Sequence, residues 1–311
     1  ADHPDTAEAL VSLSQVAERR DDLEKAIELM TAAFAIHAKR PVLDQSISDL
    51  TRMGELLLAA KQHDEAATFL RDALTLASGS RGQDHPSVAH LIFLAGRVAM
   101  AQKDPKQALF CFNKALSIHE KTKGKTHPDL LPLLNLSGDA NLALGKLGAA
   151  EANYKQMGSI YAKNYPPGSE WQAIAPTLLG NVATKRKDHQ KAAALFEQAL
   201  AFAEAAFGRD DLRLQVVLEK AGEAQLECGA LARAEELSRR LLEIYERDLP
   251  PDHRALLPAV RRLATIYVQT GDDRAEEMLK RTVSALEAST RAVTARTARL
   301  KAELARKKGQ S

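Results

Sequence analysis

The sequence predicts an all-α architecture: a right-handed superhelical solenoid of about seven antiparallel helix hairpins, followed by a C-terminal helix. Glycine recurs every 42 residues at five positions, and alanine keeps the same interval twelve residues later. Within each interval, two stretches of helical apolar periodicity flank a short polar turn. Apolar residues make up 45% of the chain and charged residues 27%, as in folded globular proteins. The glycines are Gly54, Gly96, Gly138, Gly180 and Gly222, and the alanines are Ala66, Ala108, Ala150, Ala192 and Ala234.

One interval shows how a hairpin is built. Val88–Ala101 and Gln107–Ile118 have helical periodicity, and Gln102–Pro105 joins them. Glycine inside a helix costs about 1 kcal/mol relative to alanine, so its recurrence needs a structural reason. We expect the glycines to allow close crossing of the two helices, together with alanines such as Ala108 and Ala115 on the second helix. A larger residue at the glycine is expected to push the helices apart.

Helix starts are predicted at the junctions Asp84–Pro86, Thr126–Pro128 and Asp252–Arg254. Asp or Thr suits a helix cap, and proline suits the first turn because it lacks an N–H that would be unpaired there. The histidines of these junctions lie one and three 42-residue intervals apart, on separate hairpins. They lack the i, i+4 spacing that gathers imidazoles around a metal, so no metal site is predicted.

Three places depart from the regular pattern. Ala26 lies only 40 residues before Ala66, which predicts a tighter first joint. The fifth junction, Tyr165–Ser169, lacks the Asp-His-Pro pattern, so a local change of path is expected there. Ala275 extends the alanine series to a seventh unit, in which Ala264 replaces the glycine and the turn is one residue shorter.

The small and apolar residues follow a fixed order: a small residue, alanine twelve positions later, an apolar residue after four more, and a last residue after three more. This order occurs at Gly96–Ala115 and Gly180–Ala199, and in weaker form at Gly54–Ala73 and Gly138–Met157. It resembles the tetratricopeptide repeat, whose usual period is 34 residues. The extra eight residues amount to about one turn on each helix. The 42-residue unit and the segment Ala115–Pro128 look like the kinesin-light-chain subclass of that family.

The resemblance covers residues 2–284 and implies a concave surface lined by the first helix of each unit, suited to a peptide or a helix. The mixed charges along this surface predict a ligand that is neither purely acidic nor purely basic. The family's groove positions fall here on Arg97, Asn135, Asp139, Asn181, Lys185, Glu219, Glu223 and Arg261.

We therefore expect a non-catalytic adaptor that binds a protein or peptide partner and takes no cofactor and no small-molecule substrate. The sequence contains no His-Glu-x-x-His, phosphate-loop or Gly-x-Ser-x-Gly motif, and adjacent carboxylates such as Glu235 and Glu236 belong to solvated helix faces. The alternative is a structural subunit or assembly factor, held in a larger complex through its convex face and basic tail. A nucleic-acid role is disfavoured because aromatic residues are sparse and the chain is net negative outside the tail.

Two regions are predicted: a repeat domain over residues 1–284 and a capping helix with a basic tail over residues 285–311. The tail carries seven Lys/Arg against two Glu, a charge of +5, which leaves −3 on residues 1–284 because the total is +2. Leu286, Val293 and Leu300 follow heptad spacing, as expected of a helix. Alternatively, the tail engages an acidic protein, RNA or an anionic membrane face.

The sequence gives few indications of compartment. No stretch reaches the roughly 20 apolar residues of a membrane span. Cys111 and Cys228 show neither a disulfide framework nor metal-ligand spacing. The first residue is Ala1 rather than methionine, so we expect a processed or truncated N-terminus. The cytoplasm is the expected location, and an organellar or exported form is the alternative.

Overall fold

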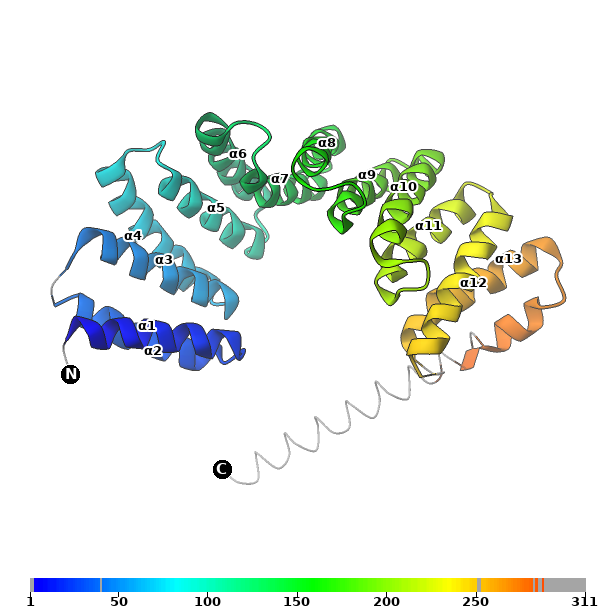
Figure 1. Ribbon diagram of the computed structural model, residues 1–311, viewed down its shortest axis with the longest axis horizontal. Helices are drawn as coiled ribbons and strands as arrows, with labels where there is room; N and C mark the ends of the chain where they lie inside the picture. Colours follow the sequence, from blue (N-terminus) through cyan, green and yellow to red (C-terminus); the bar gives the residue numbers. More distant parts are fainter. Residues whose placement is uncertain (1–2, 40, 251–252, 282, 285–286, 288–311) are drawn as a thin grey trace, which may run out of the picture. The chain divides into compact units, whose positions relative to one another are not determined.

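The computed structural model describes residues 3–39, 41–250, 253–281, 283–284 and 287, and every regular element among them is helical (Figure 1). These residues divide into two compact units, Ala1–Lys163 (unit 1) and Asn164–Ser311 (unit 2). None of the described helices is long and apolar enough to cross a membrane. The predicted boundary at residue 285 and the predicted C-terminal helix fall, apart from Glu287, outside the described residues.

Unit 1 consists of helix hairpins in which an odd-numbered helix, here called a first helix, packs against the even-numbered second helix that follows it. Successive hairpins also pack on one another, since α2 contacts α3, α4 contacts α5 and α6 contacts α7. The helices are α1 (Pro4–Arg19), α2 (Leu23–His37), α3 (Leu43–Ala59), α4 (His63–Arg81), α5 (Pro86–Ala101), α6 (Pro105–Lys123), α7 (Leu131–Ala143) and α8 (Leu147–Asn164), with the 3₁₀ turn η1 (Pro128–Leu130) before α7.

Unit 2 repeats the arrangement. Here α9 pairs with α10 and α11 with α12, while α10 contacts α11 and α12 contacts α13. Residues 275–281 are helical and follow α13. The elements are η2 (Glu170–Ala173), α9 (Ile174–Lys185), α10 (His189–Phe207), η3 (Leu212–Leu214), α11 (Gln215–Glu227), α12 (Leu231–Asp248), η4 (Arg254–Leu256) and α13 (Leu257–Thr270). The predicted helix hairpins are confirmed.

Four of the five recurring glycines lie at close helix contacts in which the partner is a side chain sixteen residues later. A Cβ atom on Gly96 would come within 2.5 Å of the Phe112 ring, and one on Gly180 within 2.6 Å of the Phe196 ring. Leu70 and Tyr154 lie in the same way against Gly54 and Gly138. The alanines that we expected to allow the crossing are buried, but they are not the nearest atoms. The glycine makes room for a large side chain.

The register of small residues extends to the first hairpin, where the sequence analysis did not identify it. Ser14 of α1 is fully buried and lies twelve residues before Ala26, as each glycine does before its alanine. Its hydroxyl donates to the Ala26 carbonyl over 2.8 Å. A hydroxyl is therefore accepted at this position because the facing helix supplies its hydrogen-bond partner.

A buried polar cluster lies at the first joint, between α2 and α3. Asp49 is 1% exposed, although the residue one interval later, Leu91, is apolar. Its carboxylate lies 2.7 Å from His37 Nδ1 and accepts from Gln45 Nε2 over 2.8 Å. Because both oxygens have partners, the buried carboxylate is tolerated and links the first hairpin to the second.

At the three junctions with an Asp-His or Thr-His pair, histidine itself is the cap, which corrects our expectation that Asp or Thr would be. Nδ1 of His85, His127 and His253 accepts from the backbone N–H two residues later, over 3.1, 3.2 and 3.3 Å. Ser169 and Asp211 stand at the same 42-residue interval and cap in the same way. The fifth junction therefore keeps its cap although its sequence differs.

Candidate peptide-binding face

All eight predicted groove residues lie on first helices, and in each unit we call the surface of these helices that carries them the first-helix face. Three of the residues lie in unit 1, on α5 and α7, and five lie in unit 2, on α9, α11 and α13. In unit 1 these are Arg97, Asn135 and Asp139, and in unit 2 they are Asn181, Lys185, Glu219, Glu223 and Arg261.

Most of these side chains are available for a ligand. Arg97, Lys185 and Arg261 are exposed, whereas Asn135 and Asn181 are half-buried. Within the part of the chain that the structure describes, these five side chains form no hydrogen bond or ion pair. An asparagine amide can both donate and accept, so the two half-buried amides could bind the backbone of a peptide.

Asp139 already has a partner within its own hairpin. The Tyr154 hydroxyl donates to Asp139 Oδ1 over 2.9 Å, beside the contact with Gly138. Burial, reinforced by this carboxylate, raises the pKa of Tyr154 well above its ordinary value of 10.0. Asp139 therefore stabilises its own hairpin.

Glu219 and Glu223 lie beside a buried arginine that the sequence analysis missed. Arg262 is 7% exposed, and its Nη2 donates to the Glu219 carbonyl over 2.9 Å. Burial lowers the pKa of Arg262, while Glu223 and Glu219 act in the opposite direction. A signal was present in the sequence, because Ser238 interrupts the series of large residues that face the glycines.

A cavity of about 290 Å³ opens between α3 and α5 of unit 1. Its α3 wall follows the predicted groove register, because Thr51 and Glu55 precede Asn135 and Asp139 by two 42-residue intervals. The predicted groove residues did not include this repeat, and the use of this helix face for binding stays a prediction. The lining residues are Asp44, Ile47, Ser48, Thr51, Arg52, Glu55, Arg81, Ser87, His90 and Leu91.

Polar contacts around this cavity link α3 to the first helices on either side of it. Arg52 of α3 pairs with Glu18 of α1, and its Nη1 lies 3.5 Å from Glu55. His90 Nε2 of α5 lies 3.4 Å from Glu55 Oε1. The contact with His90 lowers the pKa of Glu55 against the effect of burial, and Arg52 adds to the lowering. Glu55 is therefore held as a carboxylate between two hairpins.

On the second-helix side of unit 2, several charged side chains pair with one another across hairpins. Arg233 of α12 makes two hydrogen bonds, of 2.8 and 2.7 Å, to Glu197 of α10. Arg240 of α12 also pairs with Glu204 of α10, through one contact. These bidentate or repeated pairs join neighbouring hairpins and leave those groups engaged.

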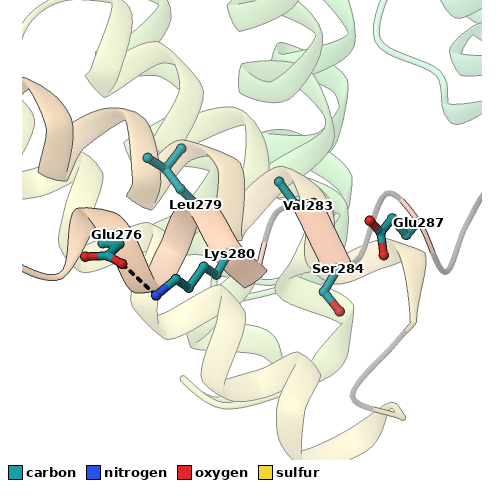
Figure 2. A pocket seen from close by; sticks show the side chains of 6 residues that line it. All are labelled: Glu276, Leu279, Lys280, Val283, Ser284 and Glu287. Atoms are coloured by element: carbon teal, nitrogen blue, oxygen red, sulfur yellow. Dashed lines mark ion pairs between the residues drawn. The ribbon is translucent and has the colours of Figure 1, made fainter.

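A second hollow, of about 370 Å³, lies along the last described helical stretch. Figure 2 shows that its lining residues come from that stretch alone, with Leu279 and Val283 exposed. Its charged pair is internal, since Lys280 Nζ lies 2.6 Å from Glu276 Oε1. It therefore offers a short apolar stripe beside an ion pair.

The remaining chemistry is sparse. No group of three or more His, Cys, Asp or Glu among the described residues could hold a metal ion. Both cysteines are free, and burial raises the pKa of the Cys111 thiol, which disfavours the reactive thiolate.

Comparison with known proteins places the fold in context. A sequence profile described as tetratricopeptide repeat matches residues 46–121, 94–162 and 171–247. No curated protein sequence matches the chain. Solved structures with repeats of kinesin-light-chain type are similar. One, with nearly identical repeats, is the putative kinesin light chain of Podosopora anserina: 20% identity, TM-score 0.58, covering 66% of this chain and 98% of that one. Another is BtubC of P. vanneervenii: 18% identity, TM-score 0.58, covering 80% and 92%.

A third solved structure covers more of the chain. It is a signal-transduction ATPase with a tetratricopeptide repeat sensor from Pyrococcus horikoshii, with 15% identity and a TM-score of 0.74. The similarity spans 96% of this chain and 44% of the ATPase. At these identities the likenesses show a shared fold.

Proposed function

The chain belongs to the tetratricopeptide repeat family, and we propose that it is an adaptor whose first-helix face binds a peptide or a helix of a partner protein. Repeats of this family form scaffolds for protein–protein interaction, and the fold is generally non-catalytic. The finer proposal concerns which face is used and what it holds.

One contrast between the two faces carries this proposal. In unit 2, arginines and glutamates of the second helices, such as Arg233 and Glu197, engage one another across hairpins. On the first-helix face, Asn181, Lys185 and Arg261 have no hydrogen-bond or ion-pair partner among the described residues. Asn181 is half-buried, so without a partner its amide loses hydration and gains nothing in the free chain, and a ligand that pairs with it is favoured. Lys185 and Arg261 are exposed and carry charges that a ligand can meet.

The character of the unpartnered groups supports a peptide rather than a polyanion or a polycation. Asparagine amides suit main-chain groups, whereas Lys185 and Glu223 carry opposite charges. A ligand with both donors and acceptors along its length, such as an extended peptide, fits this mixture.

Capture of partners from the native source tests the proposal. The intact chain is compared with a groove variant, in which Asn135, Asn181 and Lys185 are changed to alanine. A matched control changes Lys106, Gln190 and Gln198, which are exposed on second helices, to alanine. Captured proteins are identified by mass spectrometry after melting curves have shown that the variants are folded.

We expect the groove variant to lose its partners and the control to keep them. A further variant ends at residue 284. If removal of the tail abolishes capture while the groove variant retains it, the first-helix proposal is wrong. The chain would then act as a structural subunit held through its other surfaces.

A further inference from the structure

The α3–α5 cavity has the dimensions of a subsite for one side chain. Its volume of about 290 Å³ lies just below the range of about 300–1,000 Å³ that is typical of small-molecule sites. Ile47 and Leu91 contribute apolar surface and are themselves buried. The remaining lining is polar, so a long side chain with an aliphatic stem and a polar end matches the cavity.

The charges of the cavity favour a cation. Arg81 donates to Asp44 over 2.5 Å and to Ser87 over 2.9 Å, and its side chain is only 28% exposed. Asp44 is 76% exposed. The ion pairs in and beside the cavity contain three carboxylates, of Glu18, Asp44 and Glu55, and two guanidinium groups, of Arg52 and Arg81. With histidine counted as neutral, this set has one negative charge in excess.

Glu55 has unused capacity to accept hydrogen bonds. Its contacts with Arg52, at 3.5 Å, and with His90, at 3.4 Å, are both longer than a normal hydrogen bond of about 2.7–3.2 Å. A carboxylate offers about four lone-pair sites. A cationic donor entering the cavity could therefore form shorter, charge-assisted hydrogen bonds with Glu55 without displacing the ion pair between Arg52 and Glu18.

From these three observations we infer that the cavity between α3 and α5 binds a lysine or arginine side chain of the partner peptide. The aliphatic stem lies against Ile47 and Leu91, and the charged end pairs with Glu55 and the exposed Asp44. This inference rests on the proposed binding of peptides by the first-helix face and adds the chemical class that one subsite accepts.

Selection from a display library of random heptapeptides on the purified full chain tests the inference. We expect the selected pool to be enriched in lysine or arginine, with the enrichment lost for Glu55→Gln and kept for Glu65→Gln. Glu65 is an exposed carboxylate on the second helix α4, so Glu65→Gln removes the same charge outside the cavity. A peptide from the pool should bind Glu55→Gln at least about tenfold more weakly, as expected on losing a hydrogen bond to a charged group.

Glu55→Gln could weaken binding by altering the contacts among α1, α3 and α5, so a charge-reversal variant provides a second test. Glu55→Lys should shift the selected pool from basic to acidic residues, with melting curves confirming that the variant is folded. A wild-type pool rich in acidic residues would overturn the inference, as would a basic pool that survives both changes at Glu55.

The same selection separates this inference from the broader proposal. If peptides without basic residues are enriched and the Asn135, Asn181, Lys185 variant loses them, peptide binding by the first-helix face stands and the basic subsite is wrong. If the intact chain enriches no peptide, both are wrong.

Discussion

Arg262 of α13 lies over Gly222 of α11, where a Cβ atom would come within 2.6 Å of the arginine Nη1. In the four preceding hairpins, a side chain of the same hairpin, such as Phe196, lies against the glycine. In this hairpin the corresponding residue is Ser238, and its hydroxyl accepts from Arg262 Nη1 over 3.3 Å. The next hairpin thus supplies the side chain that fills the space.

Arg262→Met should raise the free energy of unfolding by about 1 kcal/mol. No carboxylate lies within ion-pair distance of this buried guanidinium among the described residues, so its lost hydration is poorly compensated, and an apolar residue of similar size is often as good or better. Arg262→Ala should instead cost about 2 kcal/mol, because it leaves a void. Urea unfolding measures both changes, and the exposed neighbour Arg261→Ala serves as the control. If Arg262→Met lowered the free energy of unfolding as much as Arg262→Ala does, the hydrogen bonds of the guanidinium would be its main contribution to stability.

Gly138→Leu should destabilise the chain by more than about 1 kcal/mol, because the new side chain overlaps the Tyr154 ring. Gly79 provides the matched control, since it is also helical but has no atom within 4 Å of its Cβ position. Gly79→Leu should leave the melting temperature unchanged or raise it, because leucine is the better helix former. Equal melting temperatures for the two variants would contradict our account of the glycine register.

Tyr154→Phe should make the chain less sensitive to alkaline pH. Because the pKa of Tyr154 is raised above 10.0 on folding, the folded chain retains a proton that the unfolded chain releases. The stability linked to this group is therefore present below about pH 10 and is lost as the pH rises further. Denaturant titrations near neutral pH and above about pH 10 measure the free energy of unfolding. Between these two conditions, Tyr154→Phe should lose less of this free energy than the wild-type chain. At neutral pH the cost should be about 1.5–3 kcal/mol, the scale of a hydrogen bond to a charged group.

His127→Ala should cost about 1 kcal/mol, because it removes the acceptor for the Asp129 N–H at the start of η1 and α7. Asparagine is a good capping residue, so His127→Asn should recover most of this loss. Thermal melts at neutral pH compare the three proteins. If alanine were as stable as histidine, water would serve the exposed N–H equally well.

The hairpins and their spacing could be predicted because each repeat carries the same small and apolar residues at the same interval. The capping residue could not be predicted, because histidine is not among the preferred capping residues. Asp84 and Thr126, which are good capping residue types, precede the histidines directly. Arg262 was missed because its role depends on a serine in the preceding hairpin. Similarly, the α3–α5 cavity depends on side-chain pairs such as Arg52 with Glu18, which lie 34 residues apart.

At Gly222 the space-filling side chain comes from the next hairpin, and this has a consequence for how the repeats are inherited. A hairpin whose glycine meets its own aromatic residue can be duplicated, deleted or moved by a single genetic event, since both partners travel together. The hairpin of α11 and α12 cannot, because Arg262 lies beyond its end. We expect recombination to have preserved α11–α13 as one heritable block, while the hairpins before it could be gained and lost singly.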